Sequence, residues 1–142
     1  MKTPVHLWIV GALSLLWNAG GGIDYFMTKT GNTDYLAQLT PEQVTFLETA
    51  PLWFDTAWAV GVWFSILGSL LLLLKSRFAG PTFLVSLIGL IVASIYTYLI
   101  SDAGNALAMS GTVAVIFTIA IPVILILLWI YARWMTAKGV LT

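Results

Sequence analysis

The stretch that decides the fold is Phe78–Ile100, FAGPTFLVSLIGLIVASIYTYLI, which contains no charged residue. It exceeds the roughly 18 apolar residues that a helix needs to cross a bilayer. Three further apolar stretches without a charge lie at approximately Val5–Ile23, Ala57–Leu74 and Thr112–Ala132. The sequence therefore predicts an all-α membrane protein in which four transmembrane helices form a bundle.

The composition agrees with this class. Of the 142 residues, 60% are hydrophobic and 8% are charged, against roughly 25% charged residues in soluble domains. We expect a single membrane domain, 1–142, with helices at approximately 5–26, 52–75, 78–100 and 112–135 and an outer loop at 27–51. The absence of cysteine excludes disulfides and thiolate sites, and the net charge of zero argues against binding to nucleic acid.

The charged residues are divided between the two ends of the predicted helices. All six acids fall at one end: Asp24, Asp34, Glu42, Glu48, Asp55 and Asp102. Five of the six bases fall at the other end, with Lys29 as the exception: Lys2, Lys75, Arg77, Arg133 and Lys138. Because Lys and Arg in short loops favour the cytoplasm, we expect both termini to be cytoplasmic in a bacterial inner membrane.

One face of the first helix carries small and polar residues at intervals of three and four: Gly11, Ser14, Asn18, Gly21 and Tyr25. Small residues let helix backbones approach closely, and an asparagine can hydrogen-bond to a neighbouring helix. The face is therefore interpreted as a packing surface, with a polar wall of a ligand cleft as the alternative. At a rise of about 1.5 Å per residue, Asn18 lies inside the hydrocarbon core and Asp24 at its boundary. Lys2 and Ala19-Gly20-Gly21 resemble a secretory signal, but the apolar region is too long for one.

The second and third helices carry similar stripes of small residues, which predict close helix contacts. The helix-packing residues expected there are Gly61, Ser65, Gly68 and Gly89.

The outer loop contains the signals of a short amphipathic helix. Thr40 is a suitable N-cap, Pro41 occupies the first helical position, and Gln43 completes a capping box. We expect this helix to cover the outer mouth of the bundle. A substrate lid or a partner-docking surface is the alternative.

The residues that could support chemistry are few. His6 is the single histidine, so the chain offers neither two axial ligands for haem nor a zinc site, and we expect no metal, no cofactor and no enzymatic activity. Asp24, Asp55 and Asp102 could form a cation site, but a solvated acidic rim is the simpler interpretation. The candidate polar cleft comprises Asn18, Asp24, Tyr25, Tyr96 and Asp102.

The chain resembles a family of small bacterial membrane proteins of uncharacterised function, whose members are often labelled sugar transporters. The resemblance covers nearly the whole chain and rests on LWNAGG at 16–21, DYFMT at 24–28, Tyr35-Leu36, TPEQ at 40–43, WAVGVW at 58–63 and LGSL at 67–70. It implies the same membrane class but supplies no catalytic residues.

Two functions remain open from the sequence. The first is a non-enzymatic accessory or packing subunit of a membrane assembly, because small-residue faces occur on three helices without an ionisable group inside a span. The second is an oligomeric facilitator of a small neutral solute such as a sugar, with Asn18, Asp24 and Tyr25 at its mouth. The expected partners are the lipid bilayer and either other membrane subunits or further copies of this chain.

Overall fold

The computed structural model describes residues 3–100 and 112–142, and this part of the chain is helical without any strand. The long helices are α1 (Val5–Lys29), α4 (Leu52–Leu73), α5 (Ala79–Ile95) and α7 (Thr112–Ala137). A π-helix, η1 (Tyr96–Ile100), continues α5, and two short helices, α2 (Thr33–Leu36) and α3 (Pro41–Thr49), connect α1 to α4. The predicted all-helical class is confirmed.

Three helices are long and apolar enough to cross a membrane by length and composition: Leu52–Leu73, Ala79–Ile100 and Ile116–Ala137. The helix α1 is not among them, although it has 25 residues. Polar groups such as His6 and Asn18, together with four glycines, lower its average hydropathy. Its glycine run does not interrupt it, because the helix continues to Lys29.

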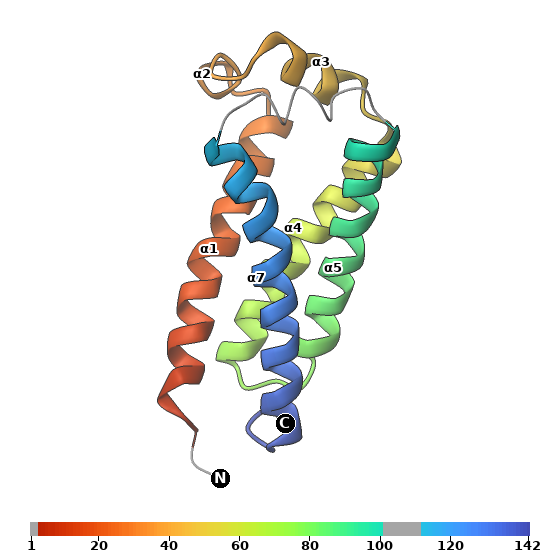
Figure 1. Cartoon of the computed structure of the whole chain (residues 1–142). Helices are drawn as coiled ribbons and strands as arrows, with labels where there is room; N and C mark the ends of the chain where they lie inside the picture. The colour runs from red at the N-terminus through yellow and green to blue at the C-terminus, as the bar shows by residue number, and fades with distance from the viewer. Residues whose placement is uncertain (1–2, 101–111) are drawn as a thin grey trace.

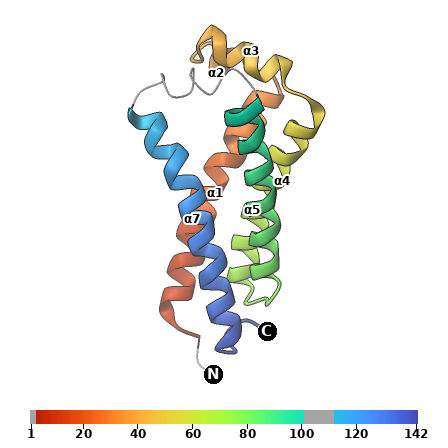
Figure 2. The same cartoon turned by 45° about the vertical axis from the view of Figure 1, so that its right-hand side comes forward.

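The four long helices lie alongside one another, and α2 and α3 lie across one end of them (Figures 1 and 2). We call this end the α3 end and the opposite end the terminal end. At the terminal end the Thr142 N–H donates to the Lys75 carbonyl at 3.0 Å, and the Lys75 ammonium reaches the Thr3 hydroxyl at 3.4 Å. Both chain ends and the α4–α5 turn therefore meet at the same end.

Contacts between the helices follow a simple order: α4 packs against α1 and α5, and α5 packs against α7. The most extensive of these contacts joins α4 and α5, where Gly61 faces Gly89. A β-carbon at Gly89 would lie 2.8 Å from both the Ala57 carbonyl oxygen and the Gly61 nitrogen. The Ser86 hydroxyl also donates to the Gly61 carbonyl across this contact. Only glycine at position 89 allows the two backbones to approach so closely.

The larger hydrophobic core lies in the terminal half of the bundle. It is formed by Leu7, Leu72, Ala79, Phe83, Leu125, Leu128, Ala132, Met135, Val140 and Leu141. Toward the α3 end, α7 diverges from α5 (Figure 2), and none of residues 116–124 is buried. In that half, α1 and α7 meet through the stacked rings of Trp17 and Phe117, whose centroids are 5.7 Å apart.

Local signals explain where several helices begin and end. The predicted capping box of α3 is confirmed: the Gln43 N–H donates to the Thr40 hydroxyl, and the Thr40 N–H donates to the Gln43 side chain. The helices α1 and α7 end in turns with Gly31 and Gly139 at positive φ, the conformation that glycine adopts most easily. The corresponding position after α4 is Lys75, with φ of 55°.

The α4–α5 contact predicts different effects of alanine at two glycines. Gly89→Ala should lower the free energy of unfolding by about 1–3 kcal/mol, because the added methyl group meets backbone atoms that cannot rotate away. Gly20→Ala should leave stability unchanged or raise it by up to about 1 kcal/mol, because nothing lies within 4 Å of its β-carbon position. Equilibrium unfolding in one mild detergent measures both. Equal losses at the two positions would contradict the proposed importance of the close approach.

Candidate functional site

The predicted polar face of α1 packs against α4. The Asn18 amide nitrogen donates to the Ser65 carbonyl at 3.1 Å and to the Ser69 hydroxyl at 2.9 Å. Asn18 is 8% exposed and Ser69 is fully buried. Both amide hydrogens of Asn18 are therefore engaged by the neighbouring helix.

The hydroxyl groups beside Asn18 extend the hydrogen bonds between α1 and α4. The Ser69 hydroxyl, which accepts from the Asn18 amide, lies 2.8 Å from the Ser14 hydroxyl, and either of these two hydroxyl groups can be the donor. The Ser14 hydroxyl is also placed to donate to the Gly11 carbonyl of its own helix, at 3.1 Å. Asn18, Ser69 and Ser14 thus form one hydrogen-bonded group, in which neighbouring bonds polarise one another.

At most of the predicted packing positions, a glycine leaves room for atoms of the neighbouring helix that an added β-carbon would approach too closely. A β-carbon at Gly11 would lie 2.6 Å from the Leu73 side chain, and one at Gly68 would lie 2.6 Å from the Phe83 ring. At Gly61 the nearest atom would be a backbone nitrogen of α5, at 3.4 Å.

Gly21 does not have the predicted packing role. A β-carbon there would meet nothing within 4 Å, whereas one at Gly22 would lie 2.8 Å from Ile66 of α4. The buried residues of α1 are Leu7, Gly11, Ser14, Asn18 and Gly22. A heptad pattern repeats every 3.5 residues, but a straight α-helix repeats every 3.6, so the two patterns separate by about 20° per heptad. The contact with α4 follows the straight helix and reaches Gly22.

Aromatic side chains link α1, α3, α4 and η1 at the α3 end. Tyr25 meets Trp58 edge to face at a centroid distance of 4.8 Å. Trp58 lies beside Phe54, and Phe54 lies 5.1 Å from Tyr96. Phe46 of α3 contacts both Phe54 and Tyr96. Tyr25 and Tyr96 therefore belong to one continuous packed cluster, although they do not touch each other.

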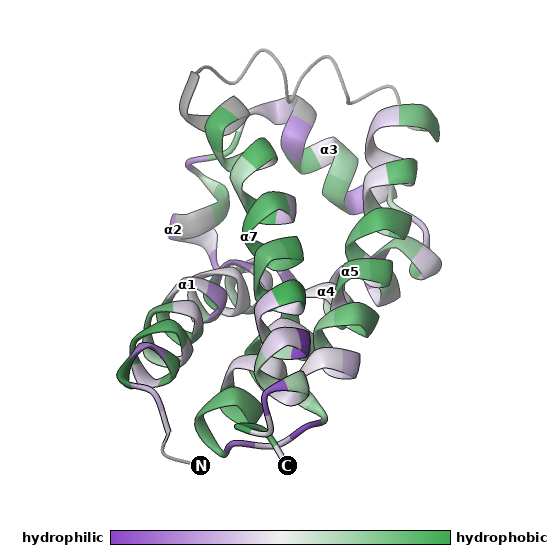
Figure 3. Cartoon of the chain, turned by 60° about the horizontal axis from the view of Figure 1, so that its bottom comes forward, coloured by the Kyte–Doolittle hydropathy of each residue, from purple (hydrophilic) through white to green (hydrophobic). Residues whose placement is uncertain are grey.

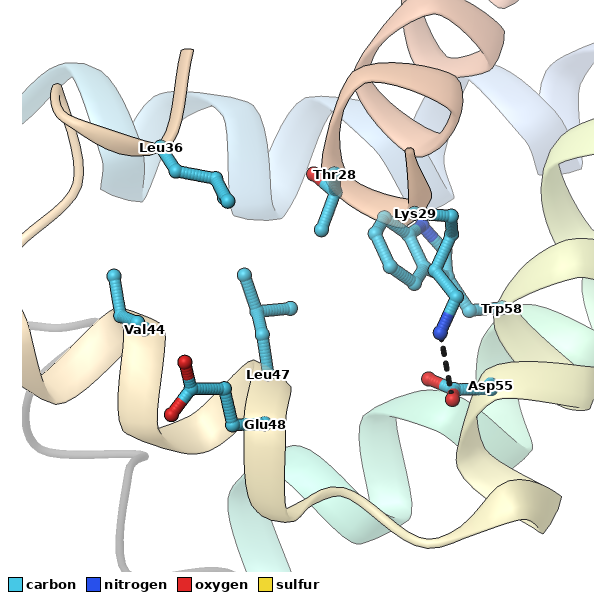
Figure 4. Close-up of a pocket in the computed structure, with 8 residues that line it drawn as sticks. All are labelled: Thr28, Lys29, Leu36, Val44, Leu47, Glu48, Asp55 and Trp58. Carbon is cyan, nitrogen blue, oxygen red and sulfur yellow. Dashed lines mark hydrogen bonds and ion pairs between the residues drawn. The ribbon is translucent and has the colours of Figure 1, made fainter. Parts of the chain in front are cut away.

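A cavity of about 130 Å³ opens between α1, α3 and α4 at this end, with Leu36 of α2 also in its wall (Figure 4). At one side of it, the Lys29 ammonium forms an ion pair with the Asp55 carboxylate at 2.8 Å. Lys29 is the one base that the sequence places with the acids, and this pair accounts for it. Glu48 supplies a further carboxylate to the wall, and Trp58 supplies an indole ring.

The residues of the predicted polar cleft do not share this cavity. Asn18 lies deep in the α1–α4 contact, and Asp24 is exposed near the end of α1. Tyr25 and Tyr96 lie in the aromatic cluster, and Asp102 falls outside the described ranges.

The cavity was missed by the sequence-based reasoning, since its wall depends on where α3 lies over the ends of α1 and α4. The available signal was Lys29, a base alone among acids. Within residues 3–100 and 112–142, no group of three His, Cys, Asp or Glu side chains is placed to hold a metal ion.

Comparisons with protein-family models, with curated proteins and with solved structures found no match to this chain. Its function therefore has to be inferred from its own residues and their geometry.

The hydrogen-bond chain predicts energetic coupling between Asn18 and Ser69. In a double-mutant cycle with Asn18→Leu and Ser69→Ala, we expect a coupling of about 0.6–1.7 kcal/mol, the range for polar contacts between membrane helices. Pairing Asn18→Leu with Ser86→Ala is the control, because the Ser86 hydroxyl bonds within the α4–α5 contact. The losses in free energy of unfolding caused by these two changes should be additive to within about 0.5 kcal/mol. Unfolding in a single detergent gives all the values, and coupling in the control pair alone would refute the assignment.

Proposed function

We propose that this protein crosses a bacterial inner membrane four times, with α1 as the fourth span. Its 25 residues correspond to about 37 Å of helix, enough for a hydrocarbon core of about 30 Å. It packs along α4, from the contact of Gly11 with Leu73 to that of Tyr25 with Trp58. A helix that packs along a spanning helix over that length lies at the same depth in the bilayer. An even number of spans also places both chain termini on one side of the membrane, in agreement with their position at the terminal end.

The distribution of hydropathy and charge supports the same arrangement. Hydrophobic residues dominate α5 and α7, and hydrophilic ones gather near the chain ends and on α3 (Figure 3). At the terminal end, Arg133 lies over the ring of Trp129 and Lys138 lies over that of Trp134. Bases beside aromatic rings are typical of a membrane interface, and short basic segments favour the cytoplasm. We therefore place the terminal end in the cytoplasm.

The proposed topology can be tested by cysteine labelling, because the chain has no native cysteine. Gln38→Cys should react with a membrane-impermeant maleimide in intact cells. Thr3→Cys and Thr142→Cys should react only after the membrane is opened. If α1 does not cross, Thr3→Cys will be labelled in intact cells while Thr142→Cys stays protected.

Within this topology we propose that the protein is a non-enzymatic accessory subunit of a membrane assembly. The observation that carries the proposal is the exposure of residues 116–124 of α7, none of which is fully buried against the described part of the chain. The span Ile116–Ala137 is 17% buried, against 28% for Leu52–Leu73 and 33% for Ala79–Ile100. Apart from the contact of Phe117 with Trp17, the apolar side chains of this segment are available to a helix of a partner subunit.

The buried polar groups support a packing role rather than a solute pathway. No buried side-chain nitrogen or oxygen in the described ranges lacks a hydrogen-bond partner. The facilitator alternative requires Asn18 to face a passage, but Asn18 donates both amide hydrogens to α4. Its geometry therefore favours the first hypothesis.

Purification from native membranes in a gentle detergent tests the accessory role. We expect a different membrane protein to copurify in a fixed ratio with the wild-type chain. The double variant Ile119→Trp/Val123→Trp should lose it, because a packed helix cannot accommodate two added rings. The control Ile88→Trp, at an exposed position of α5, should retain it, because lipid chains rearrange around a bulky side chain. A homo-oligomer without other subunits would contradict the proposal.

A further inference from the structure

The cavity between α1, α3 and α4 has no part in the packing role proposed above. Its volume of about 130 Å³ is below the roughly 300 Å³ at which pockets for drug-sized ligands begin. It is larger than the volume that several water molecules occupy in the liquid, at about 30 Å³ each. The cavity therefore suits a group of a few heavy atoms, such as the head of a larger molecule.

The charges around the cavity favour a cation. Lys29 is paired with Asp55 at 2.8 Å, so its ammonium is already neutralised. Glu48 has no ion-pair partner in the described part of the chain. One base against two acids leaves an excess of one negative charge, which opposes an anion and attracts a positive group.

The uncharged residues of the cavity wall indicate which kind of cation fits. Trp58 lines the cavity beside the charged groups, and an indole ring attracts an ammonium through its π face. Tyr25 packs edge to face against Trp58 and restricts its ring. Leu47 and Val44 project toward the same space from α3 (Figure 4). An inorganic ion would gain nothing from these apolar side chains, whereas an organic ammonium would contact them with its carbon atoms.

We propose that this cavity binds an organic ammonium group that carries a short apolar arm. The negative charge of Glu48 attracts the ammonium into the cavity, and the apolar arm lies against Leu47, Val44 and the Trp58 ring. Two sources provide this chemistry: the ethanolamine head of a membrane lipid and a free soluble amine. Both reach the cavity from the α3 end.

Titration of the full-length protein in detergent with butylammonium chloride tests the site, with tryptophan fluorescence as the readout. Glu48→Gln should weaken binding roughly threefold, since the charge of an exposed side chain contributes modestly. Lys29→Met should strengthen binding by a similar factor, because it removes a competing ammonium from Asp55. Asp34→Asn, a matched loss of an acid on α2 outside the cavity wall, should change nothing. Neutral 1-butanol should bind more weakly than butylammonium.

The opposite signs of the two variants make the test decisive. A packing defect would shift Glu48→Gln and Lys29→Met in the same direction, and that result would overturn the proposal. Equal binding of 1-butanol and butylammonium would overturn it as well.

Native mass spectrometry of protein from mixed phosphatidylethanolamine and phosphatidylglycerol nanodiscs identifies the source. If Glu48→Gln lowers the number of retained phosphatidylethanolamine molecules, the ligand is the lipid head. If retention is unchanged while butylammonium binding falls, the ligand is a free amine. Either result supports the site, whereas loss of both lipids in equal proportion would contradict it.

Discussion

The approach of α4 and α5 leaves no room for a side chain where Gly61 faces Gly89, since a β-carbon at Gly89 would lie 2.8 Å from backbone atoms of α4. Lipid chains are as apolar as leucine, so burial of apolar surface does not drive membrane helices together. Close packing and hydrogen bonds between helices have to supply the stability. The glycine contact allows both, because it brings the Ser86 hydroxyl to the Gly61 carbonyl.

The rest of the bundle is attached to this pair in two different ways. The helix α1 binds the other face of α4 through Asn18 and Ser69, with hydrogen bonds that are strong where water is excluded. The helix α7 binds α5 through apolar packing around Phe83 and Ala132, in the terminal half. Toward the α3 end α7 diverges from α5 (Figure 2), and there it meets α1 through the stacked rings of Trp17 and Phe117. The attachment of α7 through the terminal half of the bundle is consistent with the exposure of residues 116–124.

The sequence predicts periodic features well and tertiary ones poorly. The all-helical class and the capping box at Thr40 follow from local patterns, and the structure confirms both. Gly21 was predicted in place of Gly22 because a heptad pattern and a straight helix diverge slowly along the chain. A short row of packing residues fits both patterns until its last turn. Sequence alone left Asn18 between packing and a cleft, since its hydrogen-bond partners lie on α4 and are far away in the chain. The cavity was out of reach for the same reason, because Glu48 and Lys29 line one cavity only when α3 lies over the ends of α1 and α4.

The two proposals draw on different parts of the chain, and their separation has a physical basis. Inside the apolar stretches a charge would cost about 2.5–3.5 kcal/mol to insert, so the contacts there rely on neutral groups such as Asn18 and Ser69. In the proposed topology the last turn of α1 reaches water, where a charge is tolerated. Lys29 lies in that turn and Asp55 in the first turn of α4, where the helix dipoles favour a base and an acid respectively. That placement holds the pair together without help from Glu48. Among the described residues the Glu48 charge has no ion-pair partner, which is why the proposed recognition of a cation belongs at this end of the bundle and not within it.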